Sequence, residues 1–435
     1  MTYLAVIAVA LCVFTVVVVM TVMNGLVTDF VKKNHAFVGD CVVGTDSLIG
    51  FAWYEDFIAE LSDADYVLAA TPVINTFGLV NSRSTANNAA LPLIGIDIDS
   101  HIKVTEFASA LHYRLDEPTK AFVPLYDSNL PGCIIGIDLL VNRQTDGEYA
   151  HLDFLSRWSY SVTCFPLTAK GALAKIGTSL AANSKVFHYS DNAHTGLAKV
   201  DSGTVYLPFG QLQQLCSMAQ PLKRTTDIYI KFSPGADIEE CTAKVALLFS
   251  DFVGRYRDRD QGWLFDTVTV KDWKSYRRDS IAPMEKEQTM MILLFTMVGI
   301  ITVFIILVVF YMVISQKSKD IGILKSIGAS ATNVTVLFLV FAGMIGIVGG
   351  GIGIAFGVLF LTKINVLEDW LFIKFGWQLW NRQVYAIGDI PNESSAALLT
   401  IIFVAAIIAC LAGALLPVVR GASKNCVDVL RVNEL

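Results

Sequence analysis

Charge is scarce in this chain, because only 17% of its 435 residues are Asp, Glu, Lys or Arg. The deficit is local, since four segments contain no such residue. These segments are Met1–Thr28, Thr289–Gln316, Ser326–Thr362 and Ser394–Val419, with 28, 28, 37 and 26 residues. A helix that crosses a bilayer needs about 20 apolar residues, so each segment is long enough. The lack of charge excludes a wholly soluble enzyme, and the unbroken apolar runs exclude a β-barrel, whose strands alternate.

Motifs for catalysis and nucleotide binding are also absent. The segment Gly322–Ser326 lacks the glycine spacing of a GxxxxGK[ST] phosphate loop. The six His show no HExxH or comparable ligand spacing, and no GxSxG occurs. The four charge-free segments hold no ionisable group of the kind that marks a proton pathway or an intramembrane active site. We therefore expect no enzymatic activity, no cofactor and no metal, and the net charge of −6 gives no sign of a nucleic-acid partner.

The eight cysteines do not define a disulfide framework. Five of them fall between the first and second charge-free segments, an odd number, and no CxxC occurs. We favour mostly buried thiols, and disulfides among these five stay open. They are Cys41, Cys133, Cys164, Cys216 and Cys241.

The first apolar segment has two interpretations, a membrane helix or a cleaved signal peptide. No basic residue precedes Leu4, and Leu4–Met23 is longer than the usual apolar core of about 7–15 residues in a signal peptide. The following Asn24-Gly25-Leu26 is not a small-x-small cleavage site. We therefore expect a helix that is retained.

Basic residues give the expected orientation, because they concentrate on the cytoplasmic side of membrane helices. Lys317–Lys325 holds three Lys and one Asp, and Arg420–Leu435 holds two Arg and one Lys. Both segments are then cytoplasmic, and the large domain is extracytoplasmic. We expect a membrane protein of four transmembrane α-helices with a large α/β domain between helices 1 and 2. Its parts are helix 1 (1–28), the domain (29–288), helix 2 (289–316), a cytoplasmic coupling helix (317–333), helix 3 (334–362), an outer loop (363–393), helix 4 (394–419) and a tail (420–435).

The large domain reads as mixed α/β, and its length favours two subdomains. Short β-rich segments bounded by turn residues predict strands at Val73–Val80, Leu91–Ile98, Gly132–Ile137, Thr204–Pro208 and Asp227–Phe232. Helical spacing of apolar residues predicts helices at Phe209–Met218 and Ile238–Phe249. The interval Asn142–Val186 shows no clear pattern. Trp273 and Tyr276 fit either membrane-interface anchors or packing within the domain.

Glycine is concentrated in the third apolar segment. Three GxxxG pairs there permit close approach between helices. Contacts with another helix and packing within the chain both fit, and in either case this helix packs on protein on at least one side. The candidate packing residues are Gly346, Gly349, Gly350, Gly353 and Gly357.

The segment between the second and third apolar runs predicts a short amphipathic helix. Ile321, Leu324 and Ile327 recur at three-residue spacing and form one apolar ridge, and Gly328 can end the helix. Such a helix either docks in a partner's groove or lies on the membrane surface. The candidate coupling residues are Lys317, Lys319, Asp320, Ile321, Ile323, Leu324, Lys325, Ile327 and Gly328.

These residues resemble the FtsX/MacB-type permeases of ABC transporters, and within them the LolC/LolE-like lipoprotein-release permeases. Glu285-Lys286 and Lys319–Ser330 carry the resemblance to the superfamily, while Met23-Asn24-Gly25 and the outer loop favour the lipoprotein-release branch. Other similar segments are Leu93–Asp97, Gly132–Gly136, Thr195-Gly196 with Asp201, Val205–Pro208, Asp272-Trp273, Gln378-Leu379, Val384-Tyr385, Ile390-Pro391 with Glu393, Pro417, Arg420 and Leu430-Arg431. The chain departs from the family in having no basic segment before its first helix and in having Gly322 where the family often has Ala.

The resemblance implies a non-catalytic subunit in the cell inner membrane. A separate ABC ATPase, similar to LolD, would bind the coupling helix, and a second permease subunit, the same chain or another, would complete the transporter. The substrate would be a lipoprotein passed to a periplasmic carrier. Alternatives within the superfamily are a MacB-like efflux permease and an FtsX-like regulator of cell-wall hydrolases. A membrane-anchored sensor is the alternative from another class, although only short charged segments would face the cytoplasm.

Overall fold

A computed structural model describes residues 2–82, 88–124, 126–140, 149, 158–176, 179–376 and 390–423. The chain divides into two compact units. We call the first the helical unit, which comprises Met1–Asp29, Ala282–Trp380 and Asp389–Leu435. The second, the sheet unit, comprises Phe30–Ile281 and Asn381–Gly388. The outer-loop motifs Gln378-Leu379 and Val384-Tyr385 and the tail motif Leu430-Arg431 lie outside the described residues.

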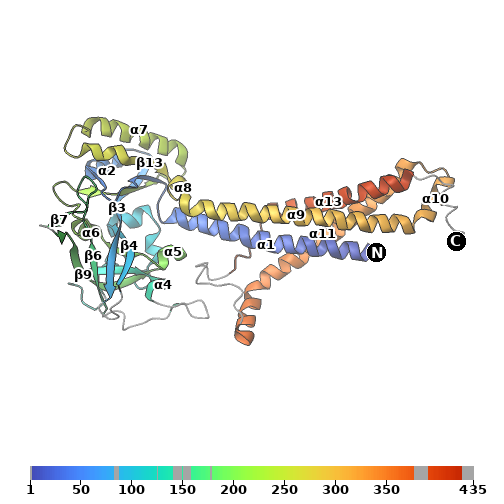
Figure 1. Ribbon diagram of the computed structural model, residues 1–435, viewed down its shortest axis with the longest axis horizontal. Coiled ribbons are helices and arrows are strands. Elements are labelled where there is room, and N and C mark those ends of the chain that lie inside the picture. Colours follow the sequence, from blue (N-terminus) through green and yellow to red (C-terminus); the bar gives the residue numbers. More distant parts are fainter. Residues whose placement is uncertain are drawn as a thin grey trace. The chain divides into compact units, whose positions relative to one another are not determined.

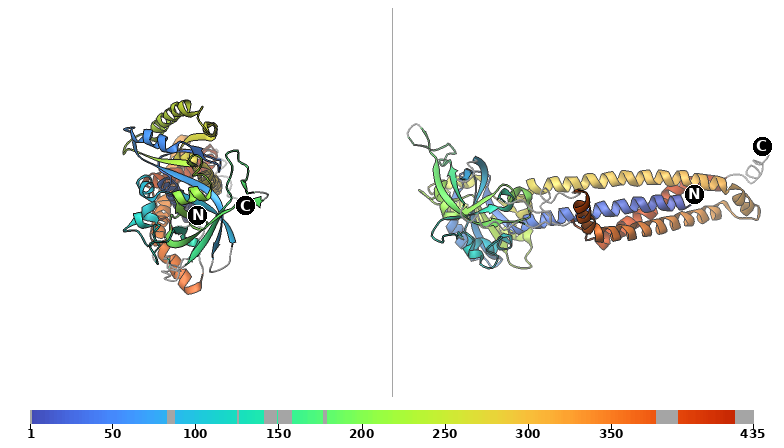
Figure 2. Two further views of the ribbon diagram at one scale, coloured as in Figure 1. Left: turned by 90° about the vertical axis from the view of Figure 1, so that its left-hand side faces the viewer. Right: turned by 90° about the horizontal axis from the view of Figure 1, so that it is seen from below.

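Long apolar helices build the helical unit, and the prediction of four membrane-type helices is confirmed. Within the residues that the structure describes, four helices are long and apolar enough to cross a membrane. They are α1 (Thr2–Ala36), α9 (Arg278–Gln316), α11 (Ala331–Phe375) and α13 (Ala396–Ser423). A short helix, α10 (Ser318–Ser326), connects α9 to α11. Figure 1 and the right-hand view of Figure 2 show α1 and α9 running side by side.

The helices are longer than the charge-free segments from which we expected them. α9 begins at Arg278 instead of Thr289, α1 continues to Ala36, and α11 continues to Phe375, beyond Thr362. Charged residues at a helix end do not interrupt the backbone hydrogen bonds, so an apolar run marks a span better than it marks a helix. The limits of the spans stay predictions.

A nine-stranded mixed sheet organises the sheet unit, in the order β13-β1-β12-β3-β4-β10-β5-β9-β6. The long strand β3 pairs with β12 through Val73 and Asp227, and with β6 through Leu79 and Thr163. The second pairing closes β3, β4, β10, β5, β9 and β6 into a ring. The strands are β1 (Cys41–Thr45), β3 (Val67–Ser82), β4 (Asn88–Ile96), β5 (Gly132–Gly136), β6 (Ser159–Cys164), β9 (Asn183–Ala193), β10 (Val205–Pro208), β12 (Asp227–Phe232) and β13 (Val268–Asp272).

Helices and short strands flank this sheet. The helices are α2 (Tyr54–Ser62), α3 (Ile98–Val104), α4 (Ile137–Leu140), α5 (Ala198–Asp201), α6 (Phe209–Leu215), α7 (Ile238–Tyr256) and α8 (Trp273–Tyr276). The two-stranded pairs are β2 (Phe51–Ala52) with β11 (Arg224–Thr225), and β7 (Lys175–Ile176) with β8 (Ser179–Leu180). The 3₁₀ helices are Phe107–Ala110, Pro118–Lys120 and Gly262–Thr267.

The predicted strands and helices of this unit are present, with changed ends. The prediction at Asp227–Phe232 coincides with β12, and Ile238 is confirmed as the start of α7, where Asp237 caps the helix by accepting from Glu239 N and Glu240 N. The strand prediction was wrong at Ile98 and Ile137, which begin α3 and α4. Both residues are buried, so their apolar character reflects the core and not a strand.

Candidate functional site

The turn after α10 closes the end of that helix with two backbone hydrogen bonds. Gly328 has a φ of +104°, its N–H donates to Lys325 O at 3.1 Å, and the N–H of Ala329 donates to Leu324 O at 3.1 Å. This is a Schellman motif, in which glycine takes the left-handed position. Ser330 then caps α11 by accepting from Asn333 N at 3.2 Å. The predicted helix end at Gly328 is confirmed, and four residues connect α10 to α11.

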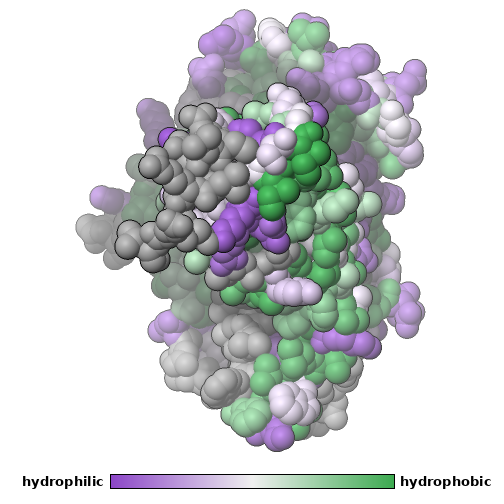
Figure 3. Space-filling model, turned by 90° about the vertical axis from the view of Figure 1, so that its right-hand side faces the viewer, coloured by the Kyte–Doolittle hydropathy of each residue, from purple (hydrophilic) through white to green (hydrophobic). Residues whose placement is uncertain are grey.

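The apolar residues of α10 divide between two faces, which corrects the expected ridge. Ile321 is only 4% exposed and packs in the core of the helical unit, so it does not belong to an exposed surface. Ile323, Leu324 and Ile327 are 52%, 40% and 79% exposed. We call these three residues the coupling patch. Figure 3 looks at the end of the helical unit that carries α10 and shows hydrophobic surface beside hydrophilic surface there.

The polar residues of α10 hold the helix in place. Lys325 Nζ donates to Ala422 O in α13 at 2.9 Å, which satisfies a carbonyl in the last turn of that helix. Lys317 Nζ and Asp320 Oδ2 are 2.9 Å apart, and both side chains are exposed. Lys319 is exposed and Gly322 is buried. Lys325 thus acts in positioning α10, while Lys317, Lys319 and Asp320 face solvent around the coupling patch.

The glycines of α11 form two separate stripes. Gly349, Gly353 and Gly357 face α1, where an added Cβ would lie 3.0 Å from Val9 Cβ, 2.6 Å from Ala10 O and 2.9 Å from Val17 Cγ1 respectively. Their spacing of four residues keeps them on one face of the helix. The close approach of α1 and α11 therefore depends on the missing side chains.

The second stripe faces α13. A Cβ at Gly346 would lie 3.0 Å from Ile407 Cα, and one at Gly350 would lie 3.2 Å from Phe403. The open choice between packing within the chain and packing on another chain is thus resolved for these five glycines, which pack within the chain. A glycine also permits the close approach of α13 to α9, because a Cβ at Gly413 would lie 2.7 Å from Val303 O.

A buried carboxylate joins the end of α1 to the sheet and to α8. Asp40 Oδ1 is 2.7 Å from His35 Nε2 and 3.0 Å from Lys231 Nζ, and Asp40 Oδ2 accepts from Phe232 N at 2.9 Å. The N–H of Trp273 donates to Asp40 O at 3.1 Å. Burial raises the pKa of Asp40, but the hydrogen bonds from His35, Phe232 and Lys231 outweigh it and hold the pKa below its usual value.

Sequence reasoning missed this network, which we call the Asp40 network. Its members come from α1, β12 and α8, and no local spacing links them. Trp273, for which two interpretations were open, stacks on the His35 ring and so packs within the domain. Tyr276 also packs within the domain, since its hydroxyl donates to Asp227 Oδ1 at 3.3 Å. The signal that pointed to the region was the aromatic pair just before the second apolar run.

A second contact of α1 lies against a tightly bonded loop. Asp201 accepts from Thr195 N at 2.8 Å, Thr195 Oγ1 at 2.7 Å and Gly196 N at 2.9 Å. Gly196 has a φ of +69°, and a Cβ there would lie 2.6 Å from Lys33 Nζ. Lys33 of α1 therefore contacts this loop, and the last residues of α1, which belong to the sheet unit, pack within that unit at two places.

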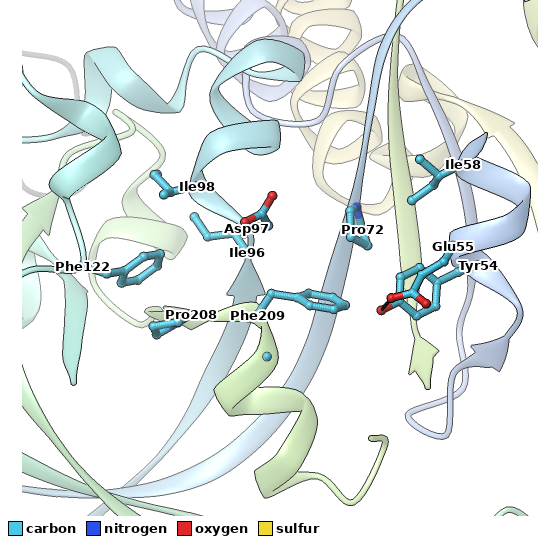
Figure 4. Close-up of a pocket in the computed structure, with 11 residues that line it drawn as sticks. Tyr54, Glu55, Ile58, Pro72, Ile96, Asp97, Ile98, Phe122, Pro208 and Phe209 are labelled. Atoms are coloured by element: carbon cyan, nitrogen blue, oxygen red, sulfur yellow. Dashed lines mark hydrogen bonds between the residues drawn. The ribbon is translucent and has the colours of Figure 1, made fainter. Parts of the chain in front are cut away.

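The sheet unit also has a cleft of about 460 Å³. Figure 4 shows Phe122, Phe209 and Tyr54 around it, with the carboxylates of Asp97 and Glu55 at its sides. Both carboxylates already have partners within the chain. Glu55 forms an ion pair with Lys223 Nζ at 2.8 Å, and Asp97 accepts a hydrogen bond from Ser100 Oγ at 2.6 Å. The surface left for a ligand is mainly apolar. Among the described residues no group of three or more His, Cys, Asp or Glu is placed to hold a metal ion.

Comparison with known sequences identifies a domain that contains the coupling segment. Residues 292–426 match the FtsX-like permease C-terminal domain. The chain is 29% identical over 128 residues to the lipoprotein-releasing system transmembrane protein LolC of Neisseria meningitidis, covering 29% of this chain and 31% of that protein. It is 25% identical over 186 residues to LolC of Xylella fastidiosa, covering 41% of this chain and 45% of that protein. The matches thus span less than half of each relative.

Solved structures show only a loose likeness. The periplasmic region of MacB from Actinobacillus actinomycetemcomitans has 9% identity and a TM-score of 0.29, covering 57% of this chain and 95% of that one. The extracellular domain of the ABC-type transporter YknZ has 13% identity and a TM-score of 0.30, covering 54% and 99%. These scores are below the level at which a shared fold is inferred, so the description of the sheet unit rests on its own strand order.

Proposed function

We propose that this chain is an ABC transporter permease of the type that it resembles, FtsX and LolC, and that it carries the motion of a separate ATPase subunit to the sheet unit. The coupling patch on α10 carries this proposal. Its three side chains are apolar and exposed. Burying them against a partner would be favourable by about 25 cal/mol for each Å² of apolar surface removed from water. Such a patch on a short helix suits docking in a groove of a cytoplasmic partner.

The position of α10 suits it to moving membrane helices. It is continuous in sequence with α9 on one side and with α11 on the other, through connections of one and four residues. The Schellman turn and the bond from Lys325 to α13 leave α10 little freedom to move alone. A displacement of the docked helix is therefore expected to move α9, α11 and α13 with it, as one element with two arrangements.

The sheet unit receives this motion through α1 and α9. The boundary between the two units falls inside both helices. The last residues of α1, among them Lys33 and His35, pack within the sheet unit, and α9 follows directly after α8, whose Trp273 stacks on His35. We infer that the Asp40 network makes the two helix ends respond together. We further propose that the sheet unit is extracytoplasmic and that the chain lies in the cell inner membrane with a second permease subunit.

We propose that the motion of the sheet unit releases lipoproteins from the membrane. The support is the similarity to two LolC proteins, whose name describes a lipoprotein-releasing system. Withdrawal of an acyl chain from a bilayer costs about 0.8 kcal/mol per CH₂, so a substrate with several long chains needs an energy source. A LolD-like ATPase would provide it, and a periplasmic carrier would accept the substrate.

Replacing Leu324 with Asp tests the docking. An unpaired charge in a docked groove costs several kcal/mol. We expect the ATPase to be lost from the complex purified in detergent, or its transport-coupled hydrolysis to fall at least tenfold, while the permease still inserts in the membrane. Leu247→Asp is the matched control, because Leu247 is a 69% exposed leucine on α7 of the sheet unit.

The alternative role of α10 gives a different result. A helix that only lies on the membrane surface would lose lipid contact in Leu324→Asp, with the ATPase still bound and active. Wild-type yield and turnover of the ATPase with Leu324→Asp would reject docking. Equal loss with Leu247→Asp would show that the effect is not specific to the coupling patch.

A further inference from the structure

Two cysteines from distant parts of the sheet unit meet in one hydrophobic cluster. Cys164 ends β6, and Cys216 follows α6. Cys164 pairs with Asn183 of β9 across the sheet. Asn183 Nδ2 donates to Leu215 O at 2.9 Å and to Ser217 Oγ at 3.1 Å, the residues on either side of Cys216. The two thiols are hydrogen-bonded to each other and are 2% and 6% exposed.

A buried arginine lies beside this pair. Arg224 is 3% exposed, and its Nη2 donates to Ser217 O at 3.0 Å. Within the described part of the chain, its Nε and Nη1 have no hydrogen-bond partner. A buried guanidinium with two spare donors favours an anion nearby. Cys216 is the thiol on which the charge of Arg224 acts.

The charges act on the two thiols in opposite ways. The hydrogen bond from Cys216 lowers the pKa of Cys164 in spite of burial. The hydrogen bond to Cys164 and burial raise the pKa of Cys216, and Thr76 and Arg224 oppose this rise. Two neighbouring buried thiols, one with a lowered and one with a raised pKa, are an arrangement found in reactive dithiols.

We propose that Cys164 and Cys216 form a redox-active pair that closes to a disulfide when the sheet unit meets a disulfide oxidant. The oxidant is a protein disulfide or oxidised glutathione. Occurrence in the cell rests on the proposed extracytoplasmic position of the sheet unit, because disulfides form in oxidising compartments. The chemical ability of the pair does not rest on it.

The reaction proceeds by thiol–disulfide exchange. The Cys164 thiolate attacks one sulfur of the oxidant RS–SR, forms a mixed disulfide and releases RS⁻, which takes the proton that Cys164 lost. Cys216 then loses its proton, its thiolate attacks the Cys164 sulfur, and the second RS⁻ leaves and is protonated. The pair gives up two electrons and two protons, and the oxidant becomes two RSH.

The bond would fasten the end of β6 to the residue after α6. The intervening residues 165–215 contain β7, β8, β9 and β10, so their loop would be closed in the unfolded chain as well. We expect the oxidised protein to unfold at a higher temperature than the reduced protein. Because both sulfurs are buried, exchange in the folded protein requires local opening and is slow.

Thiol trapping on the full chain in detergent tests the pair. The chain is taken from membranes into acid, alkylated under denaturing conditions, digested and examined by mass spectrometry, with a second sample first incubated with oxidised glutathione during partial opening in urea. We expect a cross-linked peptide of Cys164 and Cys216 in the second sample, and Cys41, Cys133 and Cys241 alkylated in both. Free Cys164 and Cys216 after this oxidation, or a bond to another cysteine, would overturn the inference.

The first sample separates the two proposals. A pair that is reduced as isolated but closes with oxidised glutathione shows that the bond does not form in the cell, and it leaves the chemical ability of the pair intact. Cys133→Ser is the control, because Cys133 lies in the same cluster and its loss should leave the cross-link. Arg224→Met should slow closure by up to about tenfold, the change in thiolate fraction that one pKa unit gives. Arg224→Lys keeps the charge and should react faster than Arg224→Met, and equal rates in all three would remove Arg224 from the site.

Discussion

The imidazole of His35 stacks on the indole of Trp273, with ring centroids 4.3 Å apart and planes 17° from parallel. His35 lies in the last turn of α1, and Trp273 is the first residue of α8, which leads into α9. Asp40 contacts both residues. Its carboxylate lies beside the His35 ring, and its backbone carbonyl accepts a hydrogen bond from the N–H of Trp273. α1 and α8 are therefore joined within the sheet unit, by the ring stacking and by the two bonds of Asp40. The stability of this contact can be measured.

Asp40→Asn should lower the free energy of unfolding of the sheet unit by about 1–2 kcal/mol at pH 7, because bonds to a charged acceptor become bonds to a neutral one. Urea unfolding of the full chain in detergent, followed by tryptophan fluorescence, measures it. Asp46→Asn is the control, since the Asp46 side chain is 99% exposed and lies 3.9 Å from Lys271. Its effect should stay within about 0.5 kcal/mol.

The pH dependence of the same variant has a definite sign. The pKa of Asp40 is lowered in the folded state, so its contribution is complete above the unfolded value of about 3.9 and is lost as the pH falls through the folded value. The difference between wild type and Asp40→Asn should therefore shrink below about pH 4. A difference that stays constant from pH 7 to pH 3 would show that the charge of Asp40 does not stabilise the fold.

Asp227 should act in the opposite direction. Burial raises its pKa to about 6, although Thr226, Asn75 and Tyr276 donate hydrogen bonds to it. The folded state then binds a proton before the unfolded state does, so the chain should gain stability as the pH falls from about 6 to about 4. Asp227→Asn should remove a gain of about 3 kcal/mol, the order expected for a pKa shift of this size. The same urea titrations at several pH values measure it.

Asp201 provides the comparison for Asp227. Burial raises its pKa also to about 6, against the hydrogen bonds from Thr195 and Gly196. The wild-type gain between pH 6 and pH 4 should thus fall by part in either single variant and almost vanish in the double variant. A wild type whose stability does not rise over this window would contradict both assignments.

Gly353→Ala should disturb the contact of α11 with α1, because its Cβ would lie 2.6 Å from Ala10 O and 2.7 Å from Val13 Cβ. Overpacking of this kind costs about 1–3 kcal/mol. The melting temperature of the purified chain in detergent should fall by several degrees. Gly351→Ala is the matched control, since a Cβ there meets nothing within 4 Å and alanine favours the helix. An equal fall in both variants would assign the effect to helix flexibility instead of packing.

The features that could be predicted from the sequence are those that neighbouring residues determine. Unbroken apolar runs marked the long helices, because bilayer thickness sets a minimum length, and Gly328 marked the end of α10, because its left-handed conformation favours glycine. β12 was found to the residue, since Asp227–Phe232 is bounded by polar turn residues. Each of these signals lies within a few residues of the feature it predicts.

The rest depends on contacts between distant residues. The three-residue spacing predicted one apolar ridge of Ile321, Leu324 and Ile327. It does not reveal that the Ile321 side chain packs in the core of the helical unit. The GxxxG spacing did not reveal that Gly349 faces α1 while Gly350 faces α13. The Asp40 network and the closure of the ring by β3 and β6 join residues far apart in the chain, which no local pattern encodes.

Cysteine labelling should determine the sidedness of the chain, which the Lys-rich segment and the tail predict. In chains without native cysteines, Lys319→Cys should be shielded from an impermeant maleimide in intact spheroplasts and become reactive after permeabilisation. Gln383→Cys, outside the described residues, and Asp258→Cys in the sheet unit should react in both. Basic residues beside helix ends remain in the cytoplasm, whereas a large domain crosses the membrane largely regardless of its charge. Lys32 and Lys33 at the end of α1 therefore do not reverse the expectation. Labelling of position 319 with protection of positions 258 and 383 would invert the orientation, and the coupling patch would then face no cytoplasmic ATPase.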